Sequence, residues 1–132
     1  MSDVFISYSR RDSGYVDKLQ AALSERGKDV WVDVEGIRDA EVFPEVLRRA
    51  VESSDAFVFV ISPDSVCSEY CQEEIAHAVE LNKRIVPVSL REVADAEIPD
   101  EVRYRNWIPA GADEEFDESV ARITAAVEAD LA

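Results

Sequence analysis

The chain has 132 residues, of which 47% are apolar and 33% are charged, so it is long and apolar enough to bury the core of one folded domain. Acidic residues outnumber basic ones 29 to 14, and the formal net charge of −15 argues against a nucleic-acid surface and against binding to anionic membranes. The longest unbroken apolar run, Ala56 to Ile61, is far too short to cross a bilayer, and no signal peptide precedes the first strand-like run, so we expect a cytoplasmic protein.

The first third of the chain predicts a strand, a helix and a second strand. Val4 to Ile6 form a short apolar run typical of a buried strand. Apolar residues between Tyr15 and Leu23 then recur at helical spacing, and Gly27 stands where a helix C-terminal cap belongs. Val30 to Val32 predict the second strand, and we expect a loop over residues 33–43.

The middle of the chain predicts two helices on either side of a central strand. Pro44 suits the first turn of a helix. Every residue from Ala56 to Ile61 is apolar, as expected for a strand that is buried on both faces. Ser62 to Ser65 predict a turn, and a helix is expected over residues 68–81. The apolar positions of that helix are Ile75, Ala78, Val79 and Leu81.

The last part of the chain predicts two more strands and a final helix. Ile85 to Val88 form the fourth strand, in which Pro87 cannot donate a backbone hydrogen bond, and this favours an edge position or a bulge. An irregular connection is expected over residues 91–105, followed by a short strand at Trp107–Ile108. Apolar residues at helical spacing define the last helix: Phe116, Val120, Ile123 and Val127.

The alternation of strands with helices indicates right-handed crossovers and a parallel sheet. We therefore predict an α/β fold of the flavodoxin-like type. It is a three-layer sandwich in which a five-stranded parallel sheet of order 2-1-3-4-5 carries helices on both faces. Residues 1–132 are expected to form a single domain, which we expect to be a module of a longer protein.

In such a sheet, ligands bind beyond the carboxyl ends of the strands, at the point where the strand order reverses. That point lies between the first and third strands, where Ser7–Asp12 and Ser62–Cys71 meet beside the loop over residues 33–43. The glycine-rich signatures of dinucleotide sites and P-loops are absent from the sequence. The acidic pair that a phosphorylated receiver domain needs after its first strand is absent as well.

Several side chains near this point have both a functional and a purely structural interpretation. Arg10 and Arg11 are adjacent cations that could hold an anion, or two solvated surface arginines. Tyr70 could stack on a ligand or pack in the core. Glu69, Glu73 and Glu74 could carry chemistry, although carboxylates in the first turns of a helix also complement its dipole. For His77, a solvated or ion-paired side chain is the simplest interpretation.

The two cysteines, Cys67 and Cys71, lie one helical turn apart. They are too few for a disulfide framework, and we expect them to be reduced thiols. The single histidine of the chain does not supply the further ligands that a metal would need, so no metal site is expected.

Five segments of the chain carry a recognisable pattern. They are Asp3–Ser9, Val30–Asp33 with the acidic loop after it, Phe57–Pro63, Ser68-x-Tyr70-Cys71-x-x-Glu74 and Ile85–Val88. In this order they resemble the Toll/interleukin-1 receptor (TIR) domain family, in its bacterial form. The fourth segment is similar to the S-x-W-C-x-x-E helix motif of that family. The resemblance covers about residues 3–130, essentially the whole chain.

The resemblance implies one of two functions. Some members of the family are hydrolases that cleave the nicotinamide–ribose bond of NAD to nicotinamide and ADP-ribose, or that cyclise the product. Others are non-enzymatic modules that pair with further TIR domains in signal transduction. We expect an NAD nucleosidase that is activated by homotypic assembly in bacterial defence or signalling, with NAD as substrate and no cofactor. A nucleoside-processing transferase of related fold is a weaker alternative.

The same resemblance assigns roles to residues of this sequence. Glu74 matches the catalytic glutamate of the motif, and Tyr70 matches the aromatic residue that stacks near the nicotinamide. The other substrate-binding residues are expected to be Ser7 and Tyr8 on the pocket floor, Arg10 and Arg11 near the pyrophosphate, Asp33 and Cys71. Contacts between TIR domains are expected through the loop formed by Val34, Glu35, Gly36, Ile37, Arg38, Asp39, Ala40, Glu41, Val42 and Phe43.

Two positions depart from the pattern of the family. Tyr70 replaces the tryptophan of the helix motif, and its smaller ring offers less area for stacking. In the interaction loop, Ala40 stands near the place where the family often has glycine, and Gly36 comes early.

Overall fold

The chain folds around one sheet of five parallel strands. The computed structural model describes residues 3–32, 45–66, 69–91, 93, 107–111 and 116–128, with side chains at all of these except Arg10, 45–48, Asp64 and 69–71. The strands lie in the order β2-β1-β3-β4-β5. Their bounds are β1 Val4–Ser7, β2 Val30–Val32, β3 Ala56–Ile61, β4 Arg84–Ser89 and β5 Ile108–Pro109. The predicted flavodoxin-like sheet is therefore confirmed, with its fifth strand one residue later than expected.

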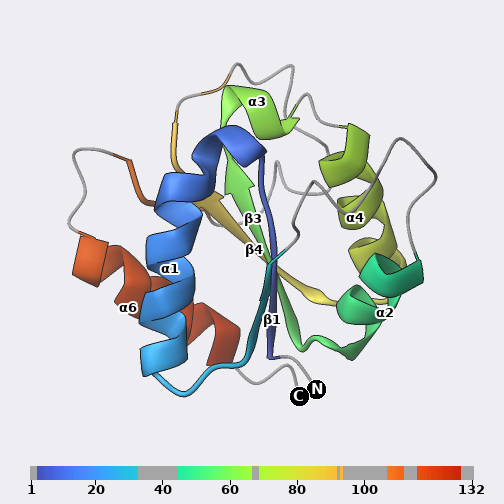
Figure 1. Ribbon diagram of the computed structural model, residues 1–132, viewed down its shortest axis with the longest axis horizontal. Coiled ribbons are helices and arrows are strands. Elements are labelled where there is room, and N and C mark those ends of the chain that lie inside the picture. The colour runs from blue at the N-terminus through green and yellow to red at the C-terminus, as the bar shows by residue number, and fades with distance from the viewer. Residues whose placement is uncertain are drawn as a thin grey trace.

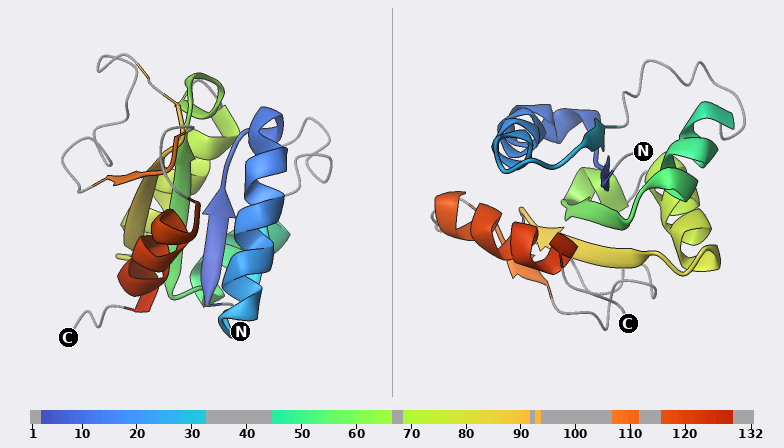
Figure 2. Two further views of the ribbon diagram at one scale, coloured as in Figure 1. Left: turned by 90° about the vertical axis from the view of Figure 1, so that its left-hand side faces the viewer. Right: turned by 90° about the horizontal axis from the view of Figure 1, so that it is seen from below.

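Helices cover both faces of this sheet and complete the three layers. Their bounds are η1 Arg10–Asp12, α1 Ser13–Glu25, α2 Glu45–Ser53, α3 Pro63–Val66, α4 Glu69–Glu80 and α6 Phe116–Glu128. Helices α1 and α6 lie on one face, and α2 and α4 lie on the other (Figure 1). The turned views in Figure 2 show the same separation of the two pairs. The short helix α3 follows the carboxyl end of β3, at the end of the sheet where we predicted the site.

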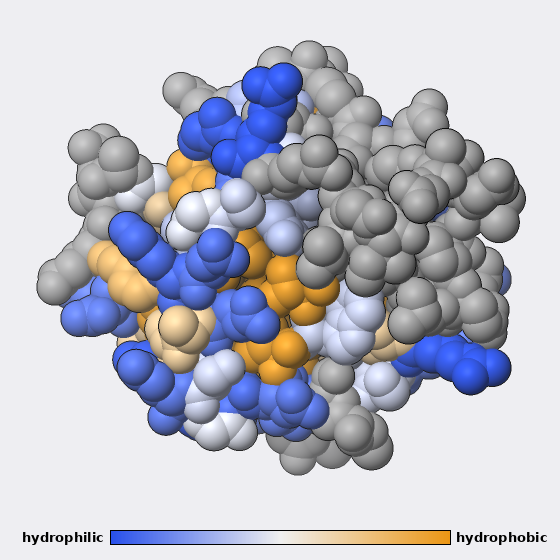
Figure 3. Space-filling view, viewed as in Figure 1, coloured by the Kyte–Doolittle hydropathy of each residue, from blue (hydrophilic) through white to orange (hydrophobic). Residues whose placement is uncertain are grey.

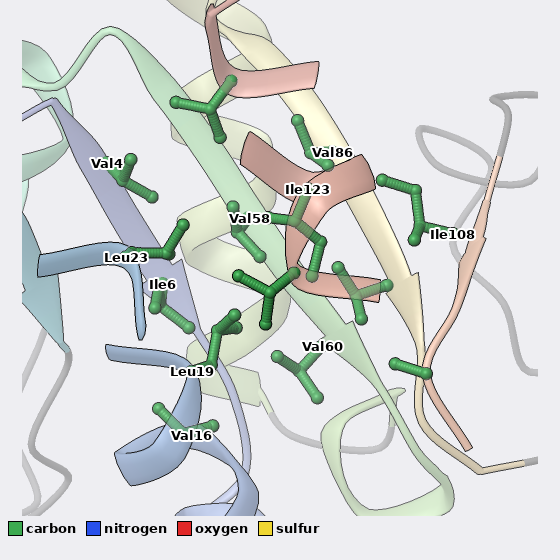
Figure 4. Close-up of a cluster of buried hydrophobic side chains, with 14 of the residues drawn as sticks. Val4, Ile6, Val16, Leu19, Leu23, Val58, Val60, Val86, Ile108 and Ile123 are labelled. Atoms are coloured by element: carbon green, nitrogen blue, oxygen red, sulfur yellow. The ribbon is translucent and has the colours of Figure 1, made fainter. Parts of the chain in front are cut away.

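The core between the sheet and helices α1 and α6 is built from aliphatic side chains (Figure 4). Alternate residues of each strand point to this face, as the pleat of a strand requires. Val4 and Ile6 of β1 meet Val16, Leu19 and Leu23 of α1, and all five are fully buried. This packing explains the helical spacing of apolar residues in the sequence of α1.

The core on the opposite face is richer in aromatic rings. Phe5 of β1 stacks on Trp31 of β2 with ring centroids 5.2 Å apart, and on Phe57 of β3 with centroids 5.5 Å apart. These rings are cross-strand neighbours in the register of the sheet, which is why they stack. Ile75 and Ala78 of α4 pack on this face. The side chain of Ser7, two residues after Phe5, points to the same face.

The sequence prediction was wrong at Ser62–Ser65, which forms not a turn but the start of helix α3. Ser62 precedes the helix, and its backbone N–H donates to Ser65 Oγ at 2.9 Å. The backbone N–H of Ser65 donates to Ser62 Oγ in return, at 3.2 Å. This reciprocal pair resembles a capping box, and Pro63 occupies the first helical position that proline favours.

Strand β4 is not an edge strand, although Pro87 favoured that position. It pairs with β3 over six residues in continuous register, with Pro87 opposite Phe59, so there is no bulge. On its other side, β5 pairs with Val88 and Ser89 alone among the described residues. Pro87 therefore lies in the part of β4 that is not paired with the described residues of β5. Its missing N–H donor leaves no described partner unpaired on that side, so an interior strand tolerates it.

Helix α4 is shorter than the predicted helix over 68–81, since its described part ends at Glu80. Leu81 and Asn82 form a turn in which Asn82 has a positive φ of 57°. Val79 and Leu81, which were expected on the apolar face, are 37% and 36% exposed.

Helix α1 ends as predicted. Gly27 takes the left-handed conformation at φ 82° and donates its N–H to Ser24 O.

The surface agrees with the high share of charged residues in the sequence. In the view of Figure 3, hydrophilic residues cover much of the described surface, and hydrophobic ones are exposed mainly in a narrow band near the middle. Within the described ranges, no helix combines the length and apolar character that crossing a membrane requires.

Candidate active site

Glu74 lies in the second turn of α4 on the side that faces the sheet. Its neighbours on that side of the helix, Ile75 and Ala78, belong to the aromatic core. Glu74 itself is 0% exposed. A carboxylate in such a position loses its hydration and gains little from packing, so its burial is unfavourable unless polar partners compensate. Buried carboxylates of this kind are candidates for a functional site.

Ser7, the last residue of β1, holds this carboxylate from the sheet. Its hydroxyl donates to Glu74 Oε1 at 2.7 Å, and Ser7 is 0% exposed as well. Ser7 lies at the carboxyl end of β1, next to the point where the strand order reverses between β1 and β3. Glu74, the predicted catalytic residue, is therefore positioned at the end of the sheet where the topology predicted a site.

A second buried carboxylate, Asp12, lies at the same end of the sheet. It occupies the position before α1 but makes no capping hydrogen bond to that helix. Instead, its Oδ2 accepts a hydrogen bond of 2.6 Å from the hydroxyl of Ser62, and its Oδ1 pairs with Nη2 of Arg91. The carboxylate thus joins three segments that follow β1, β3 and β4.

This polar cluster at Asp12 lies on the α1 side of the sheet end, since Asp12 directly precedes α1 and Val60, two residues before Ser62, belongs to the aliphatic core on that side. Ser62 and Ser65 are both 0% exposed, and Ser65 Oγ donates to Val60 O at 2.7 Å. The described polar groups of the cluster are thereby well satisfied. The cluster fixes the backbone beside the predicted site.

The other predicted site residues divide into two groups. Within the described side chains, Tyr8 is half-buried directly after β1, and Arg11 is exposed in η1. The remaining predicted side chains, including the whole predicted interaction loop, lie outside the described residues: Arg10, Asp33, Val34, Glu35, Gly36, Ile37, Arg38, Asp39, Ala40, Glu41, Val42, Phe43, Tyr70 and Cys71. The structure thus brings together Ser7 and Glu74 from the predicted set.

His77 lies one turn after Glu74 on α4 and is 8% exposed, so it is not a solvated residue. Its Nε2 is 3.7 Å from a carboxylate oxygen of Glu52 on α2, and its Nδ1 is 3.7 Å from one of Glu80. The ion-paired interpretation therefore fits its surroundings. Within the described part of the chain, no group of three or more His, Cys, Asp or Glu side chains could hold a metal ion.

Sequence reasoning missed Asp12, Ser62, Ser65 and Arg91 as a connected set. The Ser62-Pro63-x-Ser65 pattern is a capping signature that predicts part of it. Arg91 carries no local signal, since its carboxylate partner is 79 positions away in the sequence.

A comparison with family models matches residues 4–124 to the TIR domain. Among curated proteins, one of Cytobacillus dafuensis named "Putative cyclic ADP-D-ribose synthase TIR2" is 28% identical over 102 residues, which are 72% of this chain and 27% of that protein. Disease resistance protein RUN1 of Vitis rotundifolia is 32% identical over 83 residues, 61% of this chain and 6% of that protein. The chain thus spans about a quarter or less of these relatives.

Solved structures agree with the family model. A metazoan TIR-STING receptor from C. gigas has a TM-score of 0.75 and 26% identity, over 99% of this chain and 40% of that one. The TIR domain of a Toll-related receptor from Hydra magnipapillata has a TM-score of 0.71 and 22% identity, over 93% of this chain and 94% of that one. The family-model match over residues 4–124, with the parallel sheet described above, shows that this chain belongs to the TIR domain family.

Proposed function

We propose that this TIR domain cleaves the nicotinamide–ribose bond of NAD, with Glu74 as the catalytic carboxylate. The observation that carries the proposal is the burial of Glu74 at the reversal point of the sheet, where Ser7 holds its carboxylate at 2.7 Å. The Cytobacillus dafuensis relative, whose name assigns it cyclic ADP-D-ribose synthesis, supports an NAD-derived reaction. The reaction is a proposal for this chain, because the chain spans only part of that relative.

The chemistry of NAD suits a single carboxylate. Nicotinamide is a cationic pyridinium in NAD and leaves as a neutral molecule, so the step needs no general acid. The ribose C1′ then carries developing positive charge, as in an oxocarbenium-like transition state. A negative charge held next to C1′ in a site that excludes water stabilises that state strongly.

Two products are compatible with this step. Attack by water at C1′ gives ADP-ribose and releases one proton. Attack by a nitrogen of the adenine ring of the same molecule gives cyclic ADP-ribose instead. Glu74 would act in the same way in both cases, by stabilising the charge at C1′ or by attacking it and forming a transient ester.

The full burial of Glu74 also supports activation by assembly. A carboxylate with no exposed area must gain access to the substrate through a rearrangement around it. Pairing with further copies of the domain would supply the free energy for that rearrangement. The same observation favours the second candidate, a TIR–TIR interaction module without turnover, in which the buried glutamate has only a structural role.

The test is NAD consumption by the purified chain, measured both in dilute solution and on an oligomerising support. We expect turnover that rises with assembly and disappears in Glu74→Ala. Glu73→Ala is the matched control, since it removes the neighbouring carboxylate, which is exposed. The mass of the product separates the two outcomes of cleavage, because ADP-ribose is one water heavier than its cyclic form.

No turnover in either format by a folded chain would contradict the proposal and leave the interaction module. Turnover that survives Glu74→Ala would contradict the assignment of Glu74.

A further inference from the structure

Ser7 stands at the predicted floor of the site, yet its hydroxyl is directed at the carboxylate of Glu74. We infer that Ser7 is the positioning residue of the proposed reaction: it orients Glu74 from the sheet and leaves the negative charge intact. The inference rests on the proposed function. It gives Ser7 a role through Glu74 rather than a direct contact with substrate.

The backbone that carries Ser7 is held on both sides. Its strand β1 is the second of five, and pairs with β2 through Ile6 and Val32 and with β3 through Ser7 and Phe59. A side chain on such a strand has a well-defined direction, because Ser7 is paired with β3 and the residue before it is paired with β2. Ser7 is therefore a rigid point of attachment for a group on a neighbouring helix.

Glu74 needs such a point because its side chain is long. A glutamate has three rotatable bonds between its backbone and its carboxylate, and fixing them costs up to about 2 kcal/mol of rotamer entropy. The hydrogen bond from Ser7, at 2.7 Å and fully buried, selects one arrangement and turns Oε1 toward β1. An ionised carboxylate has roughly four acceptor sites, so this bond uses one and does not exhaust its capacity.

The chemical nature of the donor matters as much as its position. A serine hydroxyl is neutral, so it orients the carboxylate without cancelling the charge that must stabilise the positive C1′ of ribose. An arginine at the position of Ser7 would fix the carboxylate equally well but would offset that charge. The hydroxyl is thus suited to a carboxylate that acts by electrostatics.

The experiment compares three serine variants by steady-state NAD cleavage in the assembled full chain. Ser7→Ala should lower kcat by about 10- to 100-fold and change KM less than about 3-fold, because a displaced carboxylate weakens the transition state more than substrate binding. Ser7→Thr keeps the hydroxyl and should restore most of kcat. Ser54→Ala is the matched control, since Ser54, directly after α2, is also buried and its hydroxyl donates to Ala50 O.

A spectroscopic signal tests the bond itself without turnover. In protein labelled with ¹³C at glutamate side chains, the carboxyl resonance of Glu74, assigned by its loss in Glu74→Gln, should move in Ser7→Ala and stay in place in Ser54→Ala. Ser7→Cys replaces the hydroxyl with a weaker thiol donor and adds no methyl group, so it should give an intermediate kcat. It serves as the second donor variant where the methyl group of Ser7→Thr prevents folding.

The outcomes separate the inference from the proposed function. Wild-type kinetics in Ser7→Ala, or a loss confined to KM, would overturn the role of Ser7 while Glu74→Ala still abolished turnover. Equal loss of kcat in Ser7→Ala and in Ser7→Thr, both folded, would overturn it as well. Absence of turnover in the assembled wild-type chain would overturn the proposed function, and the inference with it.

Discussion

Asp12 and Glu74 are two carboxylates buried at the same end of the sheet, but the hydrogen-bond donors described for them differ in charge. Asp12 lies on the α1 side and pairs with the cation Arg91 as well as with Ser62. Glu74 lies on the α4 side, and the partner that β1 gives it is the neutral hydroxyl of Ser7. The comparison teaches that burial of a carboxylate does not by itself mark a site. The ion pair ties Asp12 to the segment after β4, whereas the bond from Ser7 orients Glu74 without adding a positive charge beside it.

The largest expected effect separates the two carboxylates by activity. Glu74→Gln keeps an oxygen that can accept the bond from Ser7 but removes the charge, so we expect kcat for NAD cleavage to fall by about 10²- to 10³-fold. The free energy of unfolding should change by less than about 1 kcal/mol, because the shape and the bond are kept. Turnover assays and urea denaturation measure the two quantities on the same preparation.

Asp12→Asn removes the charge of the other buried carboxylate and tests whether it is needed for turnover. Its kcat per folded molecule should stay within about 3-fold of the wild type, since Asp12 is assigned to the fold. A collapse of kcat in a fully folded Asp12→Asn chain would show that the cluster on the α1 side takes part in the reaction, and the contrast between the two carboxylates would fail.

The next effect concerns stability. Asp12→Ala should lower the free energy of unfolding by about 3 kcal/mol, because it leaves the fully buried hydroxyl of Ser62 without its acceptor and removes the carboxylate that Arg91 pairs with. Urea denaturation monitored by circular dichroism measures this loss. Asp17→Ala removes an exposed acid from helix α1, which follows Asp12; it is the control and should change stability by less than about 0.5 kcal/mol. A loss below about 1 kcal/mol in Asp12→Ala would contradict the structural role.

The sequence predicted most of the fold because its information is local. Apolar runs such as Ala56–Ile61 and the helical spacing in α1 report burial over one strand or one helix, and the order of these elements restricts the topology. The wrong prediction at Ser62–Ser65 also has a local cause. Ser62–Ser65 has the composition of a turn, and only the reciprocal serine bonds convert it into a helix.

The site was predictable in part, and for a different reason. Glu74 was identified through a motif within one helix, which needs no knowledge of the rest of the fold. The partners of the buried carboxylates are far apart in the sequence: 67 positions separate Ser7 from Glu74, and 50 separate Asp12 from Ser62. Such contacts depend on the register of the whole sheet, and no spacing in a single sequence encodes them.

Alkaline pH should lower the free energy of unfolding through Tyr15, a residue of α1. Burial raises the pKa of Tyr15 from 10.0 to about 12, and its hydroxyl has no hydrogen-bond partner among the described residues. Between these two values the unfolded chain loses the phenol proton and the folded chain keeps it, so stability is complete below pH 10 and falls as the pH rises toward 12. The expected loss is about 2 kcal/mol at pH 12.

Tyr15→Phe is the control for this titration, since it keeps the edge-to-face contact with Phe116 and removes the ionisable group. Urea denaturation of both proteins at pH 9 to 12 isolates the contribution of Tyr15 from that of other titrating residues. Parallel stability curves for the two proteins over this range would rule out a buried, neutral phenol at this position.

The smallest expected effect tests how each carboxylate is held. The side chain of Arg91 is 48% exposed and that of Asp12 is 3% exposed, so solvent screens their attraction. A double-mutant cycle of Asp12→Ala and Arg91→Ala should give a coupling free energy of about 1 kcal/mol that shrinks as salt increases. The cycle of Ser7→Ala and Glu74→Ala removes both partners of a hydrogen bond between two residues with no exposed area, and its coupling should not change with salt. Equal salt dependence of the two cycles would mean that both carboxylates are held in the same way. Different dependence would support a partly exposed ion pair at Asp12 and a fully buried hydrogen bond at Glu74.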